Sequence, residues 1–115
     1  MISGDYVNLT KENLSYVDEL GPHTRKHALQ LLTECPGTLR ITSGYRSTAK
    51  NRRVGGVPNS LHLKRRAIDL AGDAHTLHVA AGLAWALRMG PVCTGPEEVL
   101  LEHLGQPGQH LHVAW

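Results

Sequence analysis

The C-terminal stretch Gln109-His110-Leu111-His112-Val113-Ala114-Trp115 decides the fold, because polar and apolar side chains alternate along it. Such alternation predicts a β-strand with one face on the core and the other face free. His110 and His112 are two residues apart, so both side chains lie on the free face. The core-facing set is Leu111, Val113 and Trp115. The sequence therefore predicts a strand that presents two imidazoles on one surface of a sheet.

Three further strands are expected around this one. Gly105-Gln106-Pro107-Gly108 is a turn sequence, which predicts a hairpin between strands over residues 98–104 and 109–115. Alternating or short apolar patterns predict two more strands, over residues 38–42 and 66–70. Together these segments indicate a small, largely antiparallel sheet of four strands.

Helix signals occur in three segments: residues 11–20, 22–35 and 75–89. Thr10 and Asp73 are suitable caps for the first and third segments, and Pro36-Gly37 ends the second. Residues 47–61 are expected to form a loop, because they contain Gly55-Gly56 and Pro58-Asn59. The predicted fold class is α+β, with two to three helices packed on the sheet in one domain over residues 1–115. The N-terminal helices fall within 10–35 and the core within 38–115.

The length and composition exclude several classes of protein. A chain of 115 residues with a formal net charge of +2 is sufficient for one domain, and we expect a monomer. No window approaches the ~20 apolar residues of a membrane span, so membrane insertion is not expected. The N-terminus lacks a basic region followed by an apolar run, so no signal peptide is expected. Cys35 and Cys93 lack the spacing of a metal site and are interpreted as thiols.

Basic residues are concentrated between positions 46 and 66, where no acidic residue occurs. The set is Arg46, Lys50, Arg52, Arg53, Lys64, Arg65 and Arg66. A positive rim of this kind attracts an anionic ligand. We expect no nucleic-acid partner, because aromatic residues are few and do not alternate with the basic ones.

Two histidines and an aspartate form a candidate metal site. His62 and Asp69 are seven residues apart, and a C-terminal histidine can complete a set of three ligands. Imidazole nitrogen and carboxylate oxygen are both zinc ligands, and three protein ligands leave a fourth position open, as in catalytic zinc sites. The pattern alone leaves open whether His110 or His112 is the third ligand.

Several motifs around these residues resemble a known family. The segment from Ser60 to Asp69 matches Ser-x-His-x-x-Gly-x-Ala-x-Asp, except that Arg65 stands at the glycine position. Residues 43–47 and 51–56 match an arginine-bearing strand and the loop after it, and the C-terminus has His-x-His-Val. The chain thus resembles the zinc D-alanyl-D-alanine peptidases, especially small phage endolysins and L-alanyl-D-glutamate endopeptidases. The wider group includes the murein endopeptidases and the hedgehog zinc domain.

The resemblance implies a site and a function. One Zn²⁺ per chain would be held by His62, Asp69 and His112. Arg46 would bind a substrate carbonyl or carboxylate, and Ser60 would orient the substrate or a metal ligand. The implied activity is hydrolysis of a peptide bond in a peptidoglycan stem peptide, by a protein made in the cytoplasm of a phage-infected bacterium and acting at the cell wall.

The general base does not follow from the resemblance. Many relatives have an Asp or Glu three residues before the last ligand, where this chain has Gln109. We expect His110 to act instead, because an imidazole near pKa 6.5 accepts protons at neutral pH. Glu102, on the other strand of the hairpin, is the second candidate. If neither accepts the proton, the domain is a catalytically silent zinc-binding module that recognises a cell-wall peptide or a protein partner.

Overall fold

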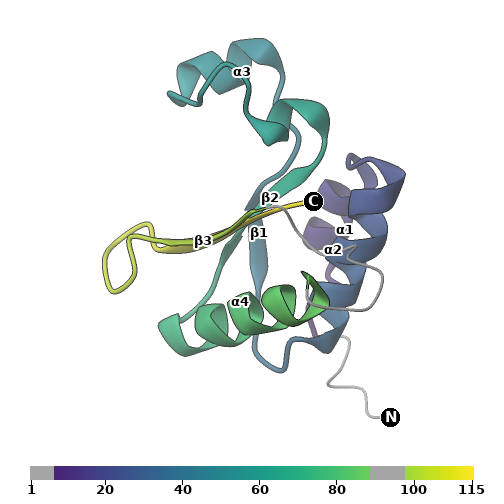
Figure 1. The fold of residues 1–115 in the computed structure, drawn as a ribbon, viewed down its shortest axis with the longest axis vertical. Coiled ribbons are helices and arrows are strands. Elements are labelled where there is room, and N and C mark those ends of the chain that lie inside the picture. The colour runs from purple at the N-terminus through teal and green to yellow at the C-terminus, as the bar shows by residue number, and fades with distance from the viewer. Residues whose placement is uncertain (1–6, 89–97) are drawn as a thin grey trace.

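The alternating C-terminal sequence forms an internal strand of an antiparallel sheet in the computed structural model, which describes residues 7–88 and 98–115. The strand order is β1-β2-β4-β3 (Figure 1). The strands are β1 (Arg40–Ser43), β2 (Ala67–Ala71), β3 (Glu98–Glu102) and β4 (His110–Ala114). The expected α+β class and the small antiparallel sheet of four strands are confirmed.

Three helices form where the sequence predicted them: α1 (Lys11–Asp18), α2 (Pro22–Glu34) and α4 (Ala74–Arg88). Thr10 caps α1 by accepting a hydrogen bond from the Asn13 amide at 3.1 Å. Asp73 Oδ1 accepts from the Thr76 amide at 2.8 Å at the start of α4. These side chains satisfy amides that have no partner within the first helical turn. The expected last residue of the third helix, Met89, lies outside the described residues.

The loop expected over residues 47–61 is wrong in part, because it contains the helix α3 (Thr48–Arg53). Ser47 caps α3 by accepting from the Lys50 amide at 3.2 Å. The glycines and prolines that suggested a loop all follow this helix, and a capping serine before Lys and Arg residues is itself a helix signal. A short 3-10 helix, η2 (Leu61–Lys64), then leads into β2. In Figure 1, α3 stands apart from the other helices, on the side of the sheet away from α4.

The hydrophobic core lies between the sheet and the helices α1, α2 and α4. The core-facing residues of β2 and β4 pair across the sheet, Ile68 with Val113 and Leu70 with Leu111. All four are fully buried, as is Leu77 of α4. Each buried aliphatic side chain of this size stabilises a fold by about 1.5–3 kcal/mol. The opposite face of the same strands is consequently left for other uses.

Two further buried side chains belong to the hydrophobic core. Trp115 is buried in the core, and Cys35 is a buried free thiol, as predicted. Cys93 lies outside the described residues. Among the helices of residues 7–88 and 98–115, none is long and apolar enough to cross a membrane.

Two buried asparagines attach the N-terminal segment to the edge of the sheet. Asn8 Oδ1 accepts from the Leu39 amide at 2.7 Å, and Asn8 Nδ2 donates to Gly37 O at 2.9 Å. Asn13 Oδ1 accepts from the Ile41 amide at 2.8 Å, and its Nδ2 donates to Asn8 O and Leu39 O. Because β1 is an edge strand, these amides have no neighbouring strand on that side. The asparagines take its place.

Candidate metal centre

One row of residues across the sheet places the candidate ligands side by side. The register pairs Ser43 with Asp69, Asp69 with His112, and His112 with Leu100. Paired residues of antiparallel strands project from the same face, so the row lies on the face away from the core. Asp69 and His112 therefore meet because β2 and β4 are neighbours. His62 comes from η2, just before β2.

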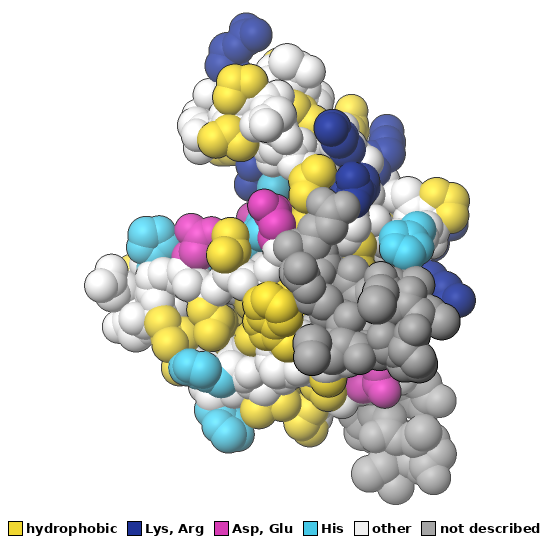
Figure 2. All heavy atoms as spheres, viewed as in Figure 1, with side chains coloured by type: hydrophobic (Ala, Val, Ile, Leu, Met, Phe, Trp, Pro, Cys, Tyr) yellow, Lys and Arg dark blue, Asp and Glu magenta, His cyan; other side chains and the backbone are white. Residues whose placement is uncertain are grey.

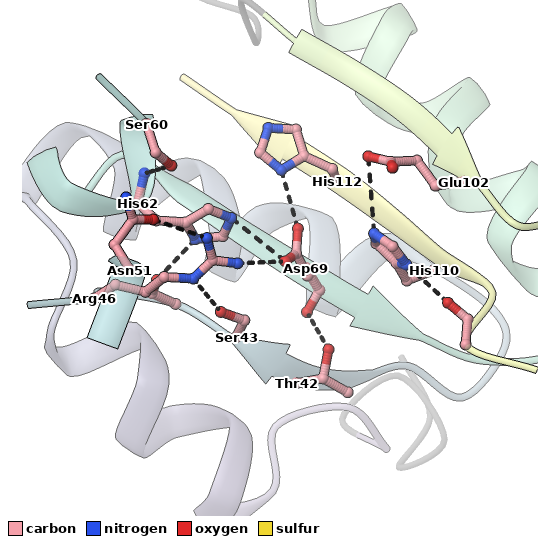
Figure 3. A network of polar contacts seen from close by, with 12 residues as sticks. Thr42, Ser43, Arg46, Asn51, Ser60, His62, Asp69, Glu102, His110 and His112 are labelled. Carbon is pink, nitrogen blue, oxygen red and sulfur yellow. Dashed lines mark hydrogen bonds and ion pairs between the residues drawn. The ribbon is translucent and has the colours of Figure 1, made fainter. Parts of the chain in front are cut away.

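The three ligands predicted from the resemblance converge. His62 Nε2 lies 3.4 Å from Asp69 Oδ2, and His112 Nδ1 lies 3.0 Å from Asp69 Oδ1 (Figure 3). One ligand atom from each residue falls within 4.8 Å of the others. The two imidazole rings meet nearly edge to face, with centroids 5.3 Å apart. A single ion between these atoms can contact all three side chains.

The orientation of His62 fits a metal ligand. Its Nδ1 donates to the carbonyl of Gly44 at 2.8 Å, because a carbonyl only accepts. In a neutral ring this leaves the lone pair on Nε2, the atom that faces Asp69. Ser60, one of the predicted site residues, accepts from the His62 amide at 3.2 Å and so holds the backbone of the ligand. Two imidazoles and one carboxylate are a donor set that suits Zn²⁺, so the residues fit the expected metal.

The charges of the cluster are mutually dependent. Burial alone would raise the pKa of Asp69, but hydrogen bonds from His112 and His62 outweigh it, and the pKa falls well below its usual range. Burial alone would lower the pKa of His112, but its hydrogen bonds to Asp69 and Glu98 outweigh burial and raise it. Asp69 thus remains a carboxylate over the whole physiological pH range, as a metal ligand must.

Arg46 lies beside the candidate ligands, and its role in binding substrate stays a prediction. Its Nη2 is 3.4 Å from Asp69 Oδ2, its Nε donates to Ser43 Oγ at 3.2 Å, and its Nη1 donates to Asn51 Oδ1 at 3.2 Å. Asn51 was not predicted from the sequence. It is a buried residue of α3 whose Nδ2 also donates to Val57 O at 2.8 Å. Asn51 therefore joins the separate α3 segment to the arginine at the metal centre.

His110 and Glu102 lie on the same face, two residue pairs further along the hairpin. Glu102 pairs with His110 in the register, and His110 Nε2 is 3.8 Å from Glu102 Oε1. His110 Nδ1 donates to Gly108 O at 2.9 Å. Both ring nitrogens of His110 thus have contacts outside the three-ligand cluster. Its role as base, and that of Glu102, stays a prediction.

Gln109 has a structural role. Its Oε1 accepts from the Gly105 amide at 2.9 Å, and its Nε2 donates to Gly72 O at 3.0 Å. These bonds attach the hairpin turn to the segment after β2. An acidic side chain in this position would lack the donor that Gly72 O accepts from.

Glu98 contacts the cluster and was missed by the sequence analysis. Its Oε1 lies 2.9 Å from His112 Nε2. The residue pairs with Ala114 and shares its face with Glu102, four residues further along β3. Glu98 lies on the same predicted hairpin strand as Glu102, but the face that either residue occupies depends on the register of β3 against β4.

The metal centre opens on two hollows. One, of about 530 Å³, is lined by Ser60, Lys64, Glu98 and His112 among others. The other, of about 450 Å³, is lined by residues that include Asp69 and His110. Figure 2 shows the notch between the α3 segment and the sheet, with acidic and histidine side chains along one wall and basic side chains beyond it. The cluster therefore lines both hollows, through Asp69 in one and His112 in the other.

Arg65 adopts the backbone conformation that explains the glycine of the resembled motif. Its φ is 60° and its ψ is 34°, in the left-handed region that glycine adopts at least cost. The side chain compensates, since Nη1 donates to Glu19 O at 2.9 Å and the guanidinium stacks 3.9 Å from the centre of the Tyr45 ring. The departure from the motif therefore leaves the turn between η2 and β2 intact.

Comparisons with known proteins were made for the whole chain. Residues 23–94 match the family model described as Peptidase M15. The matched region includes His62, Asp69 and Arg46 but stops before β3 and β4. A comparison with curated proteins found no match.

Proposed function

Because the chain belongs to the peptidase M15 family, we propose that it is a zinc peptidase that hydrolyses a peptide bond in the stem peptides of bacterial peptidoglycan. The observation that supports this most is the convergence of His62, Asp69 and His112 beside two hollows. The proposed reaction is that of a D,D-carboxypeptidase or of an L-Ala-D-Glu endopeptidase. The proposed setting is a phage endolysin, made in the host cytoplasm and acting as a monomer at the cell wall.

The proposed roles of the site residues follow from the chemistry of their side chains. His62, Asp69 and His112 would hold the zinc ion, which would supply Lewis-acid activation of water and of the substrate carbonyl when bound. Arg46 sits 3.4 Å from Asp69, where its guanidinium can bind the substrate carbonyl oxygen or a carboxylate. The basic residues around the notch suit the carboxylates of a stem peptide.

The hydrogen bond of His110 to Gly108 prepares the ring to accept a proton. Because Nδ1 donates to that carbonyl, the neutral ring carries its lone pair on Nε2. After Nε2 takes a proton from the attacking water, Glu102 Oε1 at 3.8 Å stabilises the imidazolium. The proton then passes to the amine that leaves when the peptide bond breaks.

The first experiment combines metal content with activity on purified peptidoglycan for the wild type, His62→Ala and His78→Ala. His78 is an exposed histidine of α4, so its substitution is a matched control. We expect one zinc per chain and release of new amino termini, both abolished by His62→Ala and retained by His78→Ala. Mass spectrometry of the fragments identifies the bond. Absence of zinc from the wild type would contradict the proposal.

A second candidate function is a catalytically silent zinc-binding module. The role of Gln109 in holding the hairpin favours it, because no acid stands three residues before His112. The variants His110→Ala and Glu102→Gln separate the two candidates. In an enzyme, loss of a general base lowers kcat by about 10²–10⁴-fold while zinc is retained. Zinc binding by the wild type without any cleavage would instead favour the silent module.

A further inference from the structure

His112 is the only residue of the three-ligand cluster with carboxylates on both ring nitrogens, among the contacts of the described residues. Nδ1 faces Asp69 Oδ1 at 3.0 Å, and Nε2 faces Glu98 Oε1 at 2.9 Å. In Figure 3 the ring turns one nitrogen to Asp69 and the other away from it. Since Asp69 and His62 Nε2 are together, Nδ1 is the nitrogen on the metal side of the ring.

The chemistry of imidazole then indicates the role of His112 Nε2, the nitrogen that faces away from the metal side. A neutral ring has one N–H and one lone pair, so a ring that gives its Nδ1 lone pair to a metal carries its hydrogen on Nε2. Glu98 Oε1 is at hydrogen-bond distance from that atom. An ionised carboxylate has no hydrogen to donate, so Glu98 is the acceptor of this bond. His62 has the mirrored arrangement, in which Gly44 O accepts from Nδ1 and leaves Nε2 for the metal. In both ligand rings, the nitrogen that does not face the metal side is therefore hydrogen-bonded to an oxygen acceptor.

The sheet explains how Glu98 reaches His112. Glu98 pairs with Ala114, whose side chain is a methyl group, and His112 is the diagonal neighbour two residues along β4. Diagonal neighbours are within reach of long side chains. Leu100, directly opposite His112, has no polar atom to offer. Glu102 is the other diagonal neighbour of His112, but its carboxylate lies 3.8 Å from His110 Nε2. Glu98 is thus the residue of β3 whose carboxylate contacts the His112 ring.

We propose that Glu98 is a positioning residue of the metal centre, which accepts a hydrogen bond from His112 Nε2 and so fixes the tautomer and orientation of that ligand. The proposal rests on the zinc centre of the proposed function, but not on catalysis or on the bond that is cut. Carboxylates in this position also make the imidazole more basic, and hence a stronger ligand. The residue acts through His112 and is not assigned contact with substrate.

The test measures zinc affinity by competition with a chelator for the wild type, Glu98→Ala, Glu98→Gln and Glu102→Gln. Loss of a hydrogen-bonded partner of a ligand weakens metal binding by about 10–100-fold, which we expect for Glu98→Ala. Glu98→Gln keeps an acceptor oxygen without the charge, so a smaller loss is expected. Glu102→Gln removes the same charge from the same face of β3 but contacts His110, so its zinc affinity is expected to stay within about threefold of the wild type.

A second readout examines the ring itself. Long-range ¹H–¹⁵N spectra of the zinc-loaded protein are expected to show His112 bound through Nδ1 with its hydrogen on Nε2. Wild-type affinity in Glu98→Ala, an equal loss in Glu102→Gln, or metal on Nε2 would each overturn the proposal. Glu98 is exposed at 45 % of its side chain, so the variants are expected to fold. Neither readout depends on cleavage. Failure of the peptidase proposal would therefore appear separately, as zinc binding without cleavage.

Discussion

Replacing Asn13 with alanine tests whether side-chain amides hold the edge of the sheet. The change removes three hydrogen bonds: Nδ2 to Asn8 O, Nδ2 to Leu39 O, and the Ile41 amide to Oδ1. At about 1 kcal/mol net for each bond, and about 1–3 kcal/mol more for leaving the buried Ile41 amide unpaired, the free energy of unfolding falls by about 4–6 kcal/mol. Much of the stability of a domain of this size would be lost.

The assay is urea denaturation followed by tryptophan fluorescence, since Trp115 is buried in the native state. A chelator is present throughout, so that zinc binding does not contribute to the measured stability. The control is Asn59→Ala, an exposed asparagine, for which a change within about 0.5 kcal/mol is expected. A loss below about 1 kcal/mol for Asn13→Ala would refute the reasoning, because the bonds would then contribute nothing beyond those made with water.

A companion variant separates the acceptor from the donor. Asn13→Asp keeps an oxygen for the Ile41 amide but directs a carboxylate at two carbonyl oxygens. Burial beside carbonyls raises the pKa of such a carboxyl group in the folded state above its unfolded value. The loss of stability is therefore expected to be smaller below about pH 4 and to grow as the pH rises through the folded pKa.

Three further predictions concern the metal centre. In Gly56→Ala the new methyl group overlaps Asn51 Oδ1 and lies 3.1 Å from Arg46 Nη1, so kcat/KM on peptidoglycan should fall while zinc affinity stays nearly constant. The control Gly82→Ala has open space around the new methyl group and should leave kcat/KM unchanged. Arg46→Ala should lower kcat by about 10²-fold or more through loss of carbonyl stabilisation; unchanged turnover would remove Arg46 from the reaction. Because the pKa of His112 is raised, protons compete with zinc for this residue already above the pH at which an ordinary histidine titrates, and chelator titrations should show zinc affinity falling from that pH downward. In the zinc-free protein, the stability contributed by His112 should be present at lower pH and lost as the pH rises through its folded pKa. An affinity independent of pH between 6 and 8 would contradict this.

The strands and their faces could be predicted because their side chains follow the period of the structure. Alternation in residues 109–115 placed His110 and His112 on one face, and this required no knowledge of any other segment. The capping residues Thr10 and Asp73 were equally local. Where a feature depends on neighbours in sequence, the pattern of residues was sufficient.

The parts of the site that escaped prediction depend on tertiary placement. Glu98 reaches His112 only because β3 pairs with β4 in one register, and a shift of one residue would place it on the core face. Asn51 looks like an ordinary polar residue of a basic helix until α3 brings it to Arg46. The short α3 itself was hidden by the glycines that follow it, which dominate the local composition.

The buried asparagines of the N-terminal segment have a consequence for biosynthesis. Asn8-Leu9-Thr10 and Asn13-Leu14-Ser15 are both acceptor sequences for N-linked glycans. Sugar is bulky and belongs on a surface, yet Asn8 and Asn13 are 0 % and 1 % exposed and use their amide nitrogens in hydrogen bonds. A glycan attached to either residue before folding would prevent β1 from acquiring its edge partners. Production through a eukaryotic secretory pathway should therefore yield misfolded, glycosylated chains, whereas bacterial production avoids this modification.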